Sequence, residues 1–229
     1  MHSAASARPS RLSRALRRAA DALYPPVCLH CRADLADPGL LCPACWAATP
    51  FLASPVCDRC GAPVTDDVPD AGDAPVCDHC LGVPFAFSRA RAAVLYEGVA
   101  RAMVLKLKHA DRSDLAGPGA AWMARIGAPL LAEADALVPI PLHPLRFLSR
   151  RGNQSAELAR RLAPRCGVPT APELLLRRRR TPSQGGLDAE ARRANLAGAF
   201  AVPRRARTRV EGARLILIDD VMTTGATLS

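Results

Sequence analysis

The sequence predicts an α/β domain built on a parallel sheet, preceded by a small cysteine-rich module. Three observations support this prediction. Eight of the nine cysteines fall in CxxC pairs between residues 28 and 80. After them, short apolar runs alternate with segments of helical pattern, as in βαβ units. The last apolar run, LILI at 215–218, leads directly into two aspartates and a stretch of small and hydroxylated residues.

The chain has 229 residues, enough for one domain and a smaller module. Its formal net charge is +10, carried almost entirely by arginine, since Lys106 and Lys108 are the only lysines. A basic chain favours polyanionic partners such as nucleic acid, nucleotides or phosphorylated sugars. No apolar run approaches the roughly 18–20 residues of a membrane span, and no secretory signal is evident. We therefore expect a cytoplasmic protein without a membrane span.

The N-terminal segment, residues 1–24, is rich in arginine, serine and alanine, with no acidic residue before Asp21. This composition is typical of a basic amphipathic lead-in helix, which is the interpretation we favour. A transit peptide is the alternative.

The cysteine-rich module, residues 25–84, has the spacing of a double zinc ribbon. A CxxC turn brings two thiolates within reach of one tetrahedral ion, and two such turns complete a Zn site. Disulfides would require an oxidising compartment, and redox-active CxxC motifs would require a thioredoxin-like βαβ pattern, which is absent here. The eight predicted ligands are Cys28 and Cys31, Cys42 and Cys45, Cys57 and Cys60, and Cys77 and Cys80.

Four sulfur ligands leave a zinc ion no open position, so both sites are expected to be structural. We expect sequential pairing, the first pair with the second and the third with the fourth, because it needs the shortest loops; an interleaved arrangement is the alternative. Two such sites would lower the formal charge from +10 to about +6, because each Zn²⁺ with four thiolates carries −2. His30 and His79 are expected to be bystanders, and Cys166 a small buried apolar residue.

The segments after the module follow in the order strand, helix, helix, strand, helix. A strand is expected at 91–96, a turn at Glu97–Gly98 and a helix at 99–108. Residues 114–133 have a helical pattern that we expect to break near Gly117–Gly119. A short buried strand is expected within 134–144.

The third helix is expected at 153–167, with Asn153 as its N-cap and Gly167 as its C-terminal stop. A polar arm follows at 177–198, and two more strands are expected in FAVP and RLILIDDV. Residues 85–229 would thus form one α/β domain. In such sheets ligands bind at the carboxyl ends of the strands, which is where Asp219 and Asp220 lie.

The stretch IDDVMTTGAT has the features of a phosphate site beside a ribose site. Residues 215–218 should be a strand that is buried on both faces. Small residues at 223–227 would let backbone N–H groups at the start of a following helix approach a phosphate, with hydroxyls from Thr223, Thr224 and Thr227. Two carboxylates would repel a phosphate, but they are good acceptors for the vicinal hydroxyls of a ribose.

At these residues the chain resembles type I phosphoribosyltransferases. The order of the CxxC pairs, LYEGVARAMVLKLKHADR, VPIPLHPLRFLSRRGNQSAELAR, RRRRTPSQGGLDAEARRANLAGAF and the acid pair narrows the resemblance to the ComF-type family, over roughly residues 20–229. The family usually has RGFNQ where this chain has RRGNQ. Family members also continue beyond the signature, so we expect the chain to be truncated at its C-terminus.

The resemblance implies a phosphoribosyltransferase that binds phosphoribosyl pyrophosphate with Mg²⁺. It implies that Asp219 and Asp220 hold the ribose hydroxyls and that Arg151 and Arg180 act in catalysis, Arg180 from a flexible arm at 177–195 that closes over the substrate. The residues implied to bind the 5′-phosphate are Thr223, Thr224, Gly225, Ala226 and Thr227. Those implied to bind the pyrophosphate are Arg150, Arg151 and Gly152, assisted by Lys106 and Lys108. A solvated helix face is the alternative for the two lysines.

Three functions remain open at this point. The first is transfer of phosphoribose to an unknown acceptor. The second is a non-catalytic competence factor that binds single-stranded DNA or a phosphorylated ribose, since the family name implies a link with DNA uptake and competence proteins. The third is a protein-interaction adaptor built on the zinc module. The acid pair favours the first, because a DNA groove gains nothing from two carboxylates.

Overall fold

The computed structural model describes residues 24–38, 40–64, 74–82, 85–109, 112–143, 152–182 and 188–222. The chain divides into two compact units, Met1–Ala47 and Ala48–Ser229. The first unit contains the first two CxxC pairs, and the second contains the other two pairs together with the α/β part. The expected domain limits at residues 24 and 84 stay predictions.

The two cysteine-rich segments fold alike. In each, the first CxxC pair lies in a tight turn, closed by the first cysteine's N–H donating to a carbonyl five residues on, at 2.7 Å for both Cys28 to Ala33 and Cys57 to Ala62. The second pair lies at a short helix, α2 (Pro43–Ala47) in the first segment and α3 (Asp78–Gly82) in the second. The same local chemistry therefore builds both segments.

The helical region after the second cysteine cluster is close to its prediction. It comprises α4 (Gly98–His109), the 3-10 turn η1 (Ser113–Leu115), α5 (Ala116–Ile126) and α6 (Ala128–Leu131). The expected strand at 91–96 is wrong. That segment is extended but makes only one isolated antiparallel bridge among the described residues, between Val94 and Phe51.

The break in the second helical region lies at Gly127, not near Gly117–Gly119 as expected. Gly117 and Gly119 are inside α5. A Cβ at Gly119 would lie 3.2 Å from Cδ2 of Leu158, so the missing side chain lets α5 pack closely on helix α8 (Gln154–Cys166). The glycines serve helix packing and do not end the helix.

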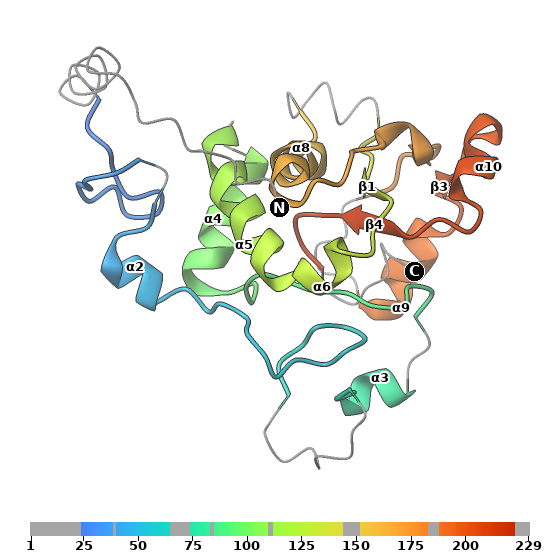
Figure 1. Ribbon diagram of the computed structural model, residues 1–229, viewed down its shortest axis with the longest axis horizontal. Helices are drawn as coiled ribbons and strands as arrows, with labels where there is room; N and C mark the ends of the chain where they lie inside the picture. The colour runs from blue at the N-terminus through green and yellow to red at the C-terminus, as the bar shows by residue number, and fades with distance from the viewer. Residues whose placement is uncertain are drawn as a thin grey trace, which may run out of the picture. The chain divides into compact units, whose positions relative to one another are not determined.

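A parallel strand pair forms the centre of the second unit. The strand β1 (Ala136–Pro139) pairs with β4 (Leu215–Ile218) in parallel, with Ala136 opposite Leu215 and Pro139 opposite Ile218. An isolated parallel bridge from Leu137 to Thr170 lies on the other side of β1. The predicted parallel sheet is confirmed in this pair (Figure 1).

The expected strand in FAVP is present, but it lies in a second two-stranded sheet and not beside β1 and β4. It is β3 (Phe200–Ala201), which pairs with β2 (Leu176–Arg177) in antiparallel orientation. Helix α9 (Ala189–Leu196) lies between these two strands in the sequence. The short helices η2 (Pro172–Leu174), η3 (Arg204–Ala206) and α10 (Arg207–Val210) complete the elements.

The two faces of β1 contact different layers. Ala136 and Val138 belong to a buried cluster with residues from the segments of η2 and η3, whereas helix α8 (Gln154–Cys166) packs on β1 and β4 and in turn contacts α5. All four residues of β1 are buried. In β4 only Ile218 is fully buried, so the expectation of full burial is wrong for 215–217, because among the described residues β4 has a neighbouring strand on one side only.

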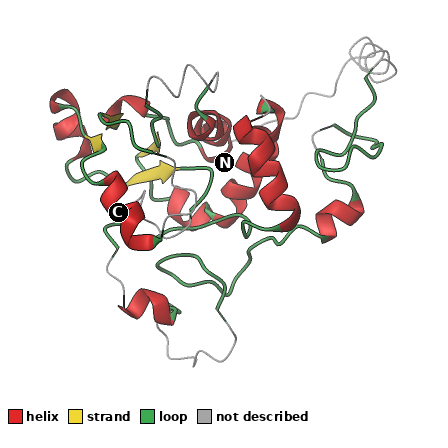
Figure 2. Cartoon of the chain, turned by 180° about the vertical axis from the view of Figure 1, so that it is seen from behind, coloured by secondary structure: helices red, strands yellow, loops and turns green. Residues whose placement is uncertain are grey.

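Helix α8 confirms its predicted ends. Asn153 is the N-cap, with its side-chain oxygen accepting from the N–H groups of Ser155 and Ala156, and Gly167 follows the helix at φ 74°. Cys166, expected to be buried, is half-buried at the end of the helix. None of the helices in the described part of the chain has the length and apolar character needed to cross a membrane. Figure 2 shows that helices and loops make up most of the described chain.

Candidate functional site

Two groups of four cysteines have the geometry of zinc sites. Cys28, Cys31, Cys42 and Cys45 form one group, and Cys57, Cys60, Cys77 and Cys80 the other, with all ligand atoms of a group within 4.8 Å of one another. The sulfur atoms of Cys31 and Cys42 are 3.7 Å apart, as are those of Cys60 and Cys77. A tetrahedral ion with Zn–S bonds of about 2.3 Å requires sulfur separations of about 3.8 Å, whereas a disulfide would require about 2 Å.

The predicted sequential pairing is therefore confirmed. Both groups consist of cysteines alone, so His30 and His79 are bystanders in the described part of the chain, as expected. The donor sets fit Zn²⁺, since four sulfur ligands leave no open position and suit a structural ion rather than a catalytic one.

The thiols of the first group differ in acidity. Burial raises the pKa of Cys28, but hydrogen bonds from the backbone N–H groups of Cys42, Cys31 and His30 lower it by more. The net result is a pKa of about 6. Burial and the neighbouring thiols raise the pKa of Cys45 to about 12. The group thus holds one thiol that ionises readily beside one that does not, and a bound Zn²⁺ would allow all four to ionise.

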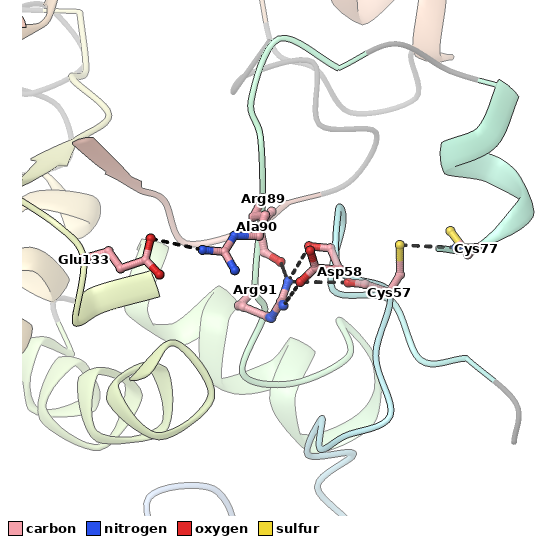
Figure 3. A network of polar contacts seen from close by, with 7 residues as sticks. All are labelled: Cys57, Asp58, Cys77, Arg89, Ala90, Arg91 and Glu133. Atoms are coloured by element: carbon pink, nitrogen blue, oxygen red, sulfur yellow. Dashed lines mark hydrogen bonds and ion pairs between the residues drawn. The ribbon is translucent and has the colours of Figure 1, made fainter. Parts of the chain in front are cut away.

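Arg91 fastens the second cysteine cluster to the segment that precedes α4, and the neighbouring Arg89 pairs with Glu133 after α6 (Figure 3). The guanidinium donates from Nη1 to the carbonyl of Asp58 at 2.8 Å and pairs through Nη2 with Oδ1 of Asp58 at 2.7 Å. Nη1 also donates to the carbonyl of Ala90 at 2.8 Å, and the Ala90 N–H donates to the carbonyl of Arg59 at 2.6 Å. The segment around Arg91, expected to be a strand, instead holds the CxxC turn of Cys57 and Cys60.

Gly61 allows this close contact. It has φ +73°, a conformation that favours glycine, and a Cβ there would lie 2.7 Å from the carbonyl oxygen of Ala90. The equivalent position in the first cluster is Arg32, at φ 67°. The first turn therefore tolerates a side chain where the second does not.

The acid pair at the end of β4 is surrounded by donors from two helices. Oδ1 of Asp219 accepts from the Ser155 hydroxyl of α8 at 3.0 Å and from the Asp220 N–H at 2.9 Å. Oδ1 of Asp220 lies 2.9 Å from Nζ of Lys108 on α4. Both carboxyl groups are largely within the protein, and the Asp220 side chain is 12% exposed.

A closed series of hydrogen bonds fixes Ser155 in front of Asp219. The Ile140 N–H, just after β1, donates to the carbonyl of Ile218 at 3.0 Å. Nδ2 of Asn153 donates to the carbonyl of Ile140 at 3.0 Å, and Oδ1 of Asn153 accepts from the Ser155 N–H at 3.0 Å. The Asn153 cap thus ties the start of α8 to the end of the sheet.

Burial raises the pKa of Asp219 to about 6, and the charge of Asp220 raises it as well. The Asp220 N–H, the Ser155 hydroxyl and the Lys108 ammonium act in the opposite direction. Because the folded-state pKa lies above the unfolded value, this carboxyl favours folding below about pH 4. That contribution is lost as the pH rises through about 6, and ionised Asp219 then destabilises the fold by up to about 3 kcal/mol relative to acid conditions.

Several residues predicted to bind ligand lie outside the described part of the chain. These are Arg150, Arg151, Thr223, Thr224, Gly225, Ala226 and Thr227. Among the described ones, Gly152 directly precedes the Asn153 cap, and Arg180 is exposed. Lys108 lies at the acid pair, while Lys106 is half-buried on the same helix. The predicted roles of these residues stay predictions.

Two arginines of the run Arg177–Arg180 make contacts within the protein. Arg177 lies over the ring of Phe200, 5.1 Å from its centroid, and Nη2 of Arg179 donates to the carbonyls of Asn195 and Ala197, each at 2.8 Å. Two of the four arginines therefore anchor the base of the polar arm. No sequence signal distinguished them from Arg178 and Arg180, and the contributions of Ser155 and Arg91 were likewise not predicted.

Comparisons with known proteins place the chain in a family. A family described as "Double zinc ribbon domain" matches residues 19–81. "DNA utilization protein YhgH" of Salmonella typhi is 32% identical over 215 residues, which cover 90% of this chain and 88% of that protein. The chain belongs to the ComF-type family. The Haemophilus influenzae relative "Competence protein F" is 27% identical over 217 residues, covering 88% of this chain and 87% of its own.

"DNA utilization protein YhgH" of Escherichia coli K12 is 29% identical over 219 residues, which cover 90% of this chain and 88% of that protein. The similarity to these relatives therefore extends over both cysteine clusters and the α/β part. No solved structure matches this ComF-type chain.

We expect about two zinc ions per chain, one for each cysteine group. A Cys45→Ser change should reduce the content to about one, and Cys166→Ser, outside both groups, should leave it at two. Elemental analysis of the purified protein measures this directly. A content far below two in the unaltered chain would contradict the two-site interpretation.

We expect Arg91→Ala to lower the free energy of unfolding of the second unit by about 2–3 kcal/mol, because charge-assisted bonds to Asp58 and Ala90 are lost. Arg160→Ala is the matched control: it removes an exposed ion pair with Glu157 on the surface of α8 and should change the stability by less than about 0.5 kcal/mol. Urea denaturation measures both, and equal effects would refute the anchoring role of Arg91.

We expect Asp219→Asn to stabilise the fold above pH 6, by up to about 3 kcal/mol, and to have little effect near pH 4. The amide keeps the acceptor for Ser155 without the buried charge. Asp114→Asn is the control of opposite sign: the side-chain hydrogen bond from Arg112 lowers the pKa of Asp114, so this change should destabilise at neutral pH. Thermal unfolding across pH 4–8 tests both, and a gain for Asp219→Asn that does not depend on pH would contradict the assignment.

Proposed function

We propose that this chain binds phosphoribosyl pyrophosphate with Mg²⁺ and transfers phosphoribose to an acceptor. The observation that supports it most is the acid pair, Asp219 and Asp220, held at the end of β4 by Ser155 and Lys108. Two adjacent carboxylates oriented by neighbouring donors can each accept a hydrogen bond from one hydroxyl of a ribose diol. Ionised Asp219 destabilises the fold at neutral pH, and buried carboxyl groups with such a cost are typical of functional sites.

The parallel pairing of β1 and β4 supports the rest of the proposed site. Since Pro139 is opposite Ile218, the segments that follow the two strands leave the same edge of the sheet. In the proposal, residues 223–227 bind the 5′-phosphate, and Arg150, Arg151 and the Gly152 backbone bind the pyrophosphate. Arg180 would approach from the arm to neutralise the departing pyrophosphate, with Mg²⁺ held mostly by substrate and water.

A cavity beside the acid pair offers room for the acceptor. Its volume is about 1320 Å³, and Asp219 and Asp220 line it together with mainly apolar side chains that include Phe87 and Trp122. This volume exceeds the roughly 300–1,000 Å³ of a pocket for a drug-sized ligand, so it leaves room for an acceptor beside the acid pair. The mainly apolar lining favours a weakly polar acceptor.

The second candidate is a non-catalytic cytoplasmic factor that binds single-stranded DNA. The printed names of the relatives, which refer to DNA utilization and competence, and the net charge of +10 favour it. A role in DNA uptake, through either activity, is part of the proposal. Phosphoribose transfer and DNA binding differ in what they require of the two carboxylates, and this difference decides between them.

The test is calorimetric titration of phosphoribosyl pyrophosphate and Mg²⁺ into the full chain. We expect binding that weakens at least about 100-fold in the double variant Asp219→Asn and Asp220→Asn, because two charge-assisted bonds of about 1.5–3 kcal/mol each are weakened. The control variant Glu190→Gln with Glu211→Gln removes two exposed acids and should bind normally.

Single-stranded DNA is the second ligand in the same experiment. DNA held by phosphate contacts should lose affinity steeply between about 50 and 200 mM salt and should bind the double Asp variant at least as well as the unaltered chain. That result, together with no binding of phosphoribosyl pyrophosphate, would replace the first proposal by the second.

A further inference from the structure

One carboxylate of the acid pair forms an ion pair with a lysine. Nζ of Lys108 lies 2.9 Å from Oδ1 of Asp220, and the two side chains are only 21% and 12% exposed. An ion pair this shielded from water interacts more strongly than a surface pair, and removing one partner leaves the other charge poorly solvated. Lys108 is therefore a fixed part of the site and not a lysine on a solvated helix face.

The position of Lys108 on α4 explains why this lysine reaches the acids. Lys108 lies in the last turn of the helix Gly98–His109, where the negative end of the helix dipole favours a cation. Residues two positions apart on a helix point away from each other, so Lys106 and Lys108 cannot both point at Asp220. The sequence alone gave the two lysines the same role, and the structure separates them.

The charge balance of the pair depends on this one residue. The groups that the structure shows facing Asp219 are the Ser155 hydroxyl of α8, the Asp220 N–H and carboxylate, and the Lys108 ammonium. Ser155 and the N–H are neutral donors. With Lys108 the fully ionised site carries −1, and without it the site would carry −2 in partly desolvated surroundings, which favours protonation.

Protonation matters because the proposed ligand donates hydrogen bonds. A ribose hydroxyl donates best to a carboxylate, and a protonated acid has lost part of its acceptor capacity. A carboxylate has two oxygens and about four acceptor positions, so an ion pair through Oδ1 leaves Asp220 able to accept a hydroxyl. Lys108 can then stay in place while the ligand binds.

We propose that Lys108 is a positioning residue that keeps the acid pair ionised and oriented at neutral pH, so that it can accept the hydroxyls of a ribose diol. The inference rests on the proposed function for the identity of the ligand. The effect on the acid pair itself can be measured without any ligand.

The first experiment is an NMR pH titration of the full chain with ¹³C-labelled aspartate carboxyl groups, with signals assigned through Asp219→Asn and Asp220→Asn. In Lys108→Gln, which keeps a donor but removes the charge, the midpoint of Asp219 should move up from about 6 by at least about one pH unit. Lys108→Arg keeps the charge and should stay near the unaltered chain. Arg101→Gln, which removes an exposed positive charge on the same helix, should also leave the midpoint unchanged. An unchanged midpoint in Lys108→Gln would overturn the proposal.

The second experiment measures the affinity for phosphoribosyl pyrophosphate and Mg²⁺ between pH 6 and 9. In Lys108→Gln a midpoint raised by about one pH unit should lower the affinity about two-fold at pH 7 and about five-fold at pH 6, with full recovery toward pH 9 as the acids ionise. Arg101→Gln should bind like the unaltered chain at every pH. A loss that is the same at every pH would overturn the positioning role and indicate a direct contact of Lys108 with the ligand. If the unaltered chain binds no ligand, the proposed function fails, and the NMR titration alone decides whether Lys108 controls the acid pair.

Discussion

The parallel pairing of β1 with β4 is the constraint on which the candidate site depends. Its register brings Ile140 opposite the end of β4, where the Ile140 N–H bonds to Ile218. From there Asn153 and Ser155 return to Asp219 through hydrogen bonds of about the same length. A shift of one residue in the register would move the acids away from Ser155 and reverse the faces that α8 and the η2 segment cover.

Short local patterns in the sequence predicted the cysteine groups, the ends of helix α8 and the position of the acid pair. The CxxC spacing was sufficient to predict both cysteine groups and their pairing, because each thiol pair is positioned by its own turn. The Asn153 cap and the Gly167 stop were likewise readable, since both act within one helix end. The acid pair could be located because an apolar strand and two charges are adjacent in the sequence.

The failures have a common physical origin in contacts between distant segments. The segment 91–96 has strand composition, but its backbone bonds to Pro50 and Leu52, on either side of Phe51, and its Arg91 side chain bonds to Asp58. Gly119 was expected to break a helix, but it lies inside α5, where the absence of a side chain makes room for Leu158, far along the chain. The partner of Lys108 is also distant, at Asp220. No pattern within a short window specifies such pairs.

The two cysteine clusters share one local design but not one thermodynamic role. The first belongs to a compact unit of its own, whereas Gly61 and Arg91 join the second to the unit that carries the acid pair. A metal bound only by the folded state contributes its binding free energy to whatever folds with it. Zinc in the first cluster thus stabilises a short segment, and zinc in the second is linked to the sheet. Loss of zinc from the first cluster would therefore disorder that unit alone, whereas loss from the second cluster would reach the unit that carries the acid pair.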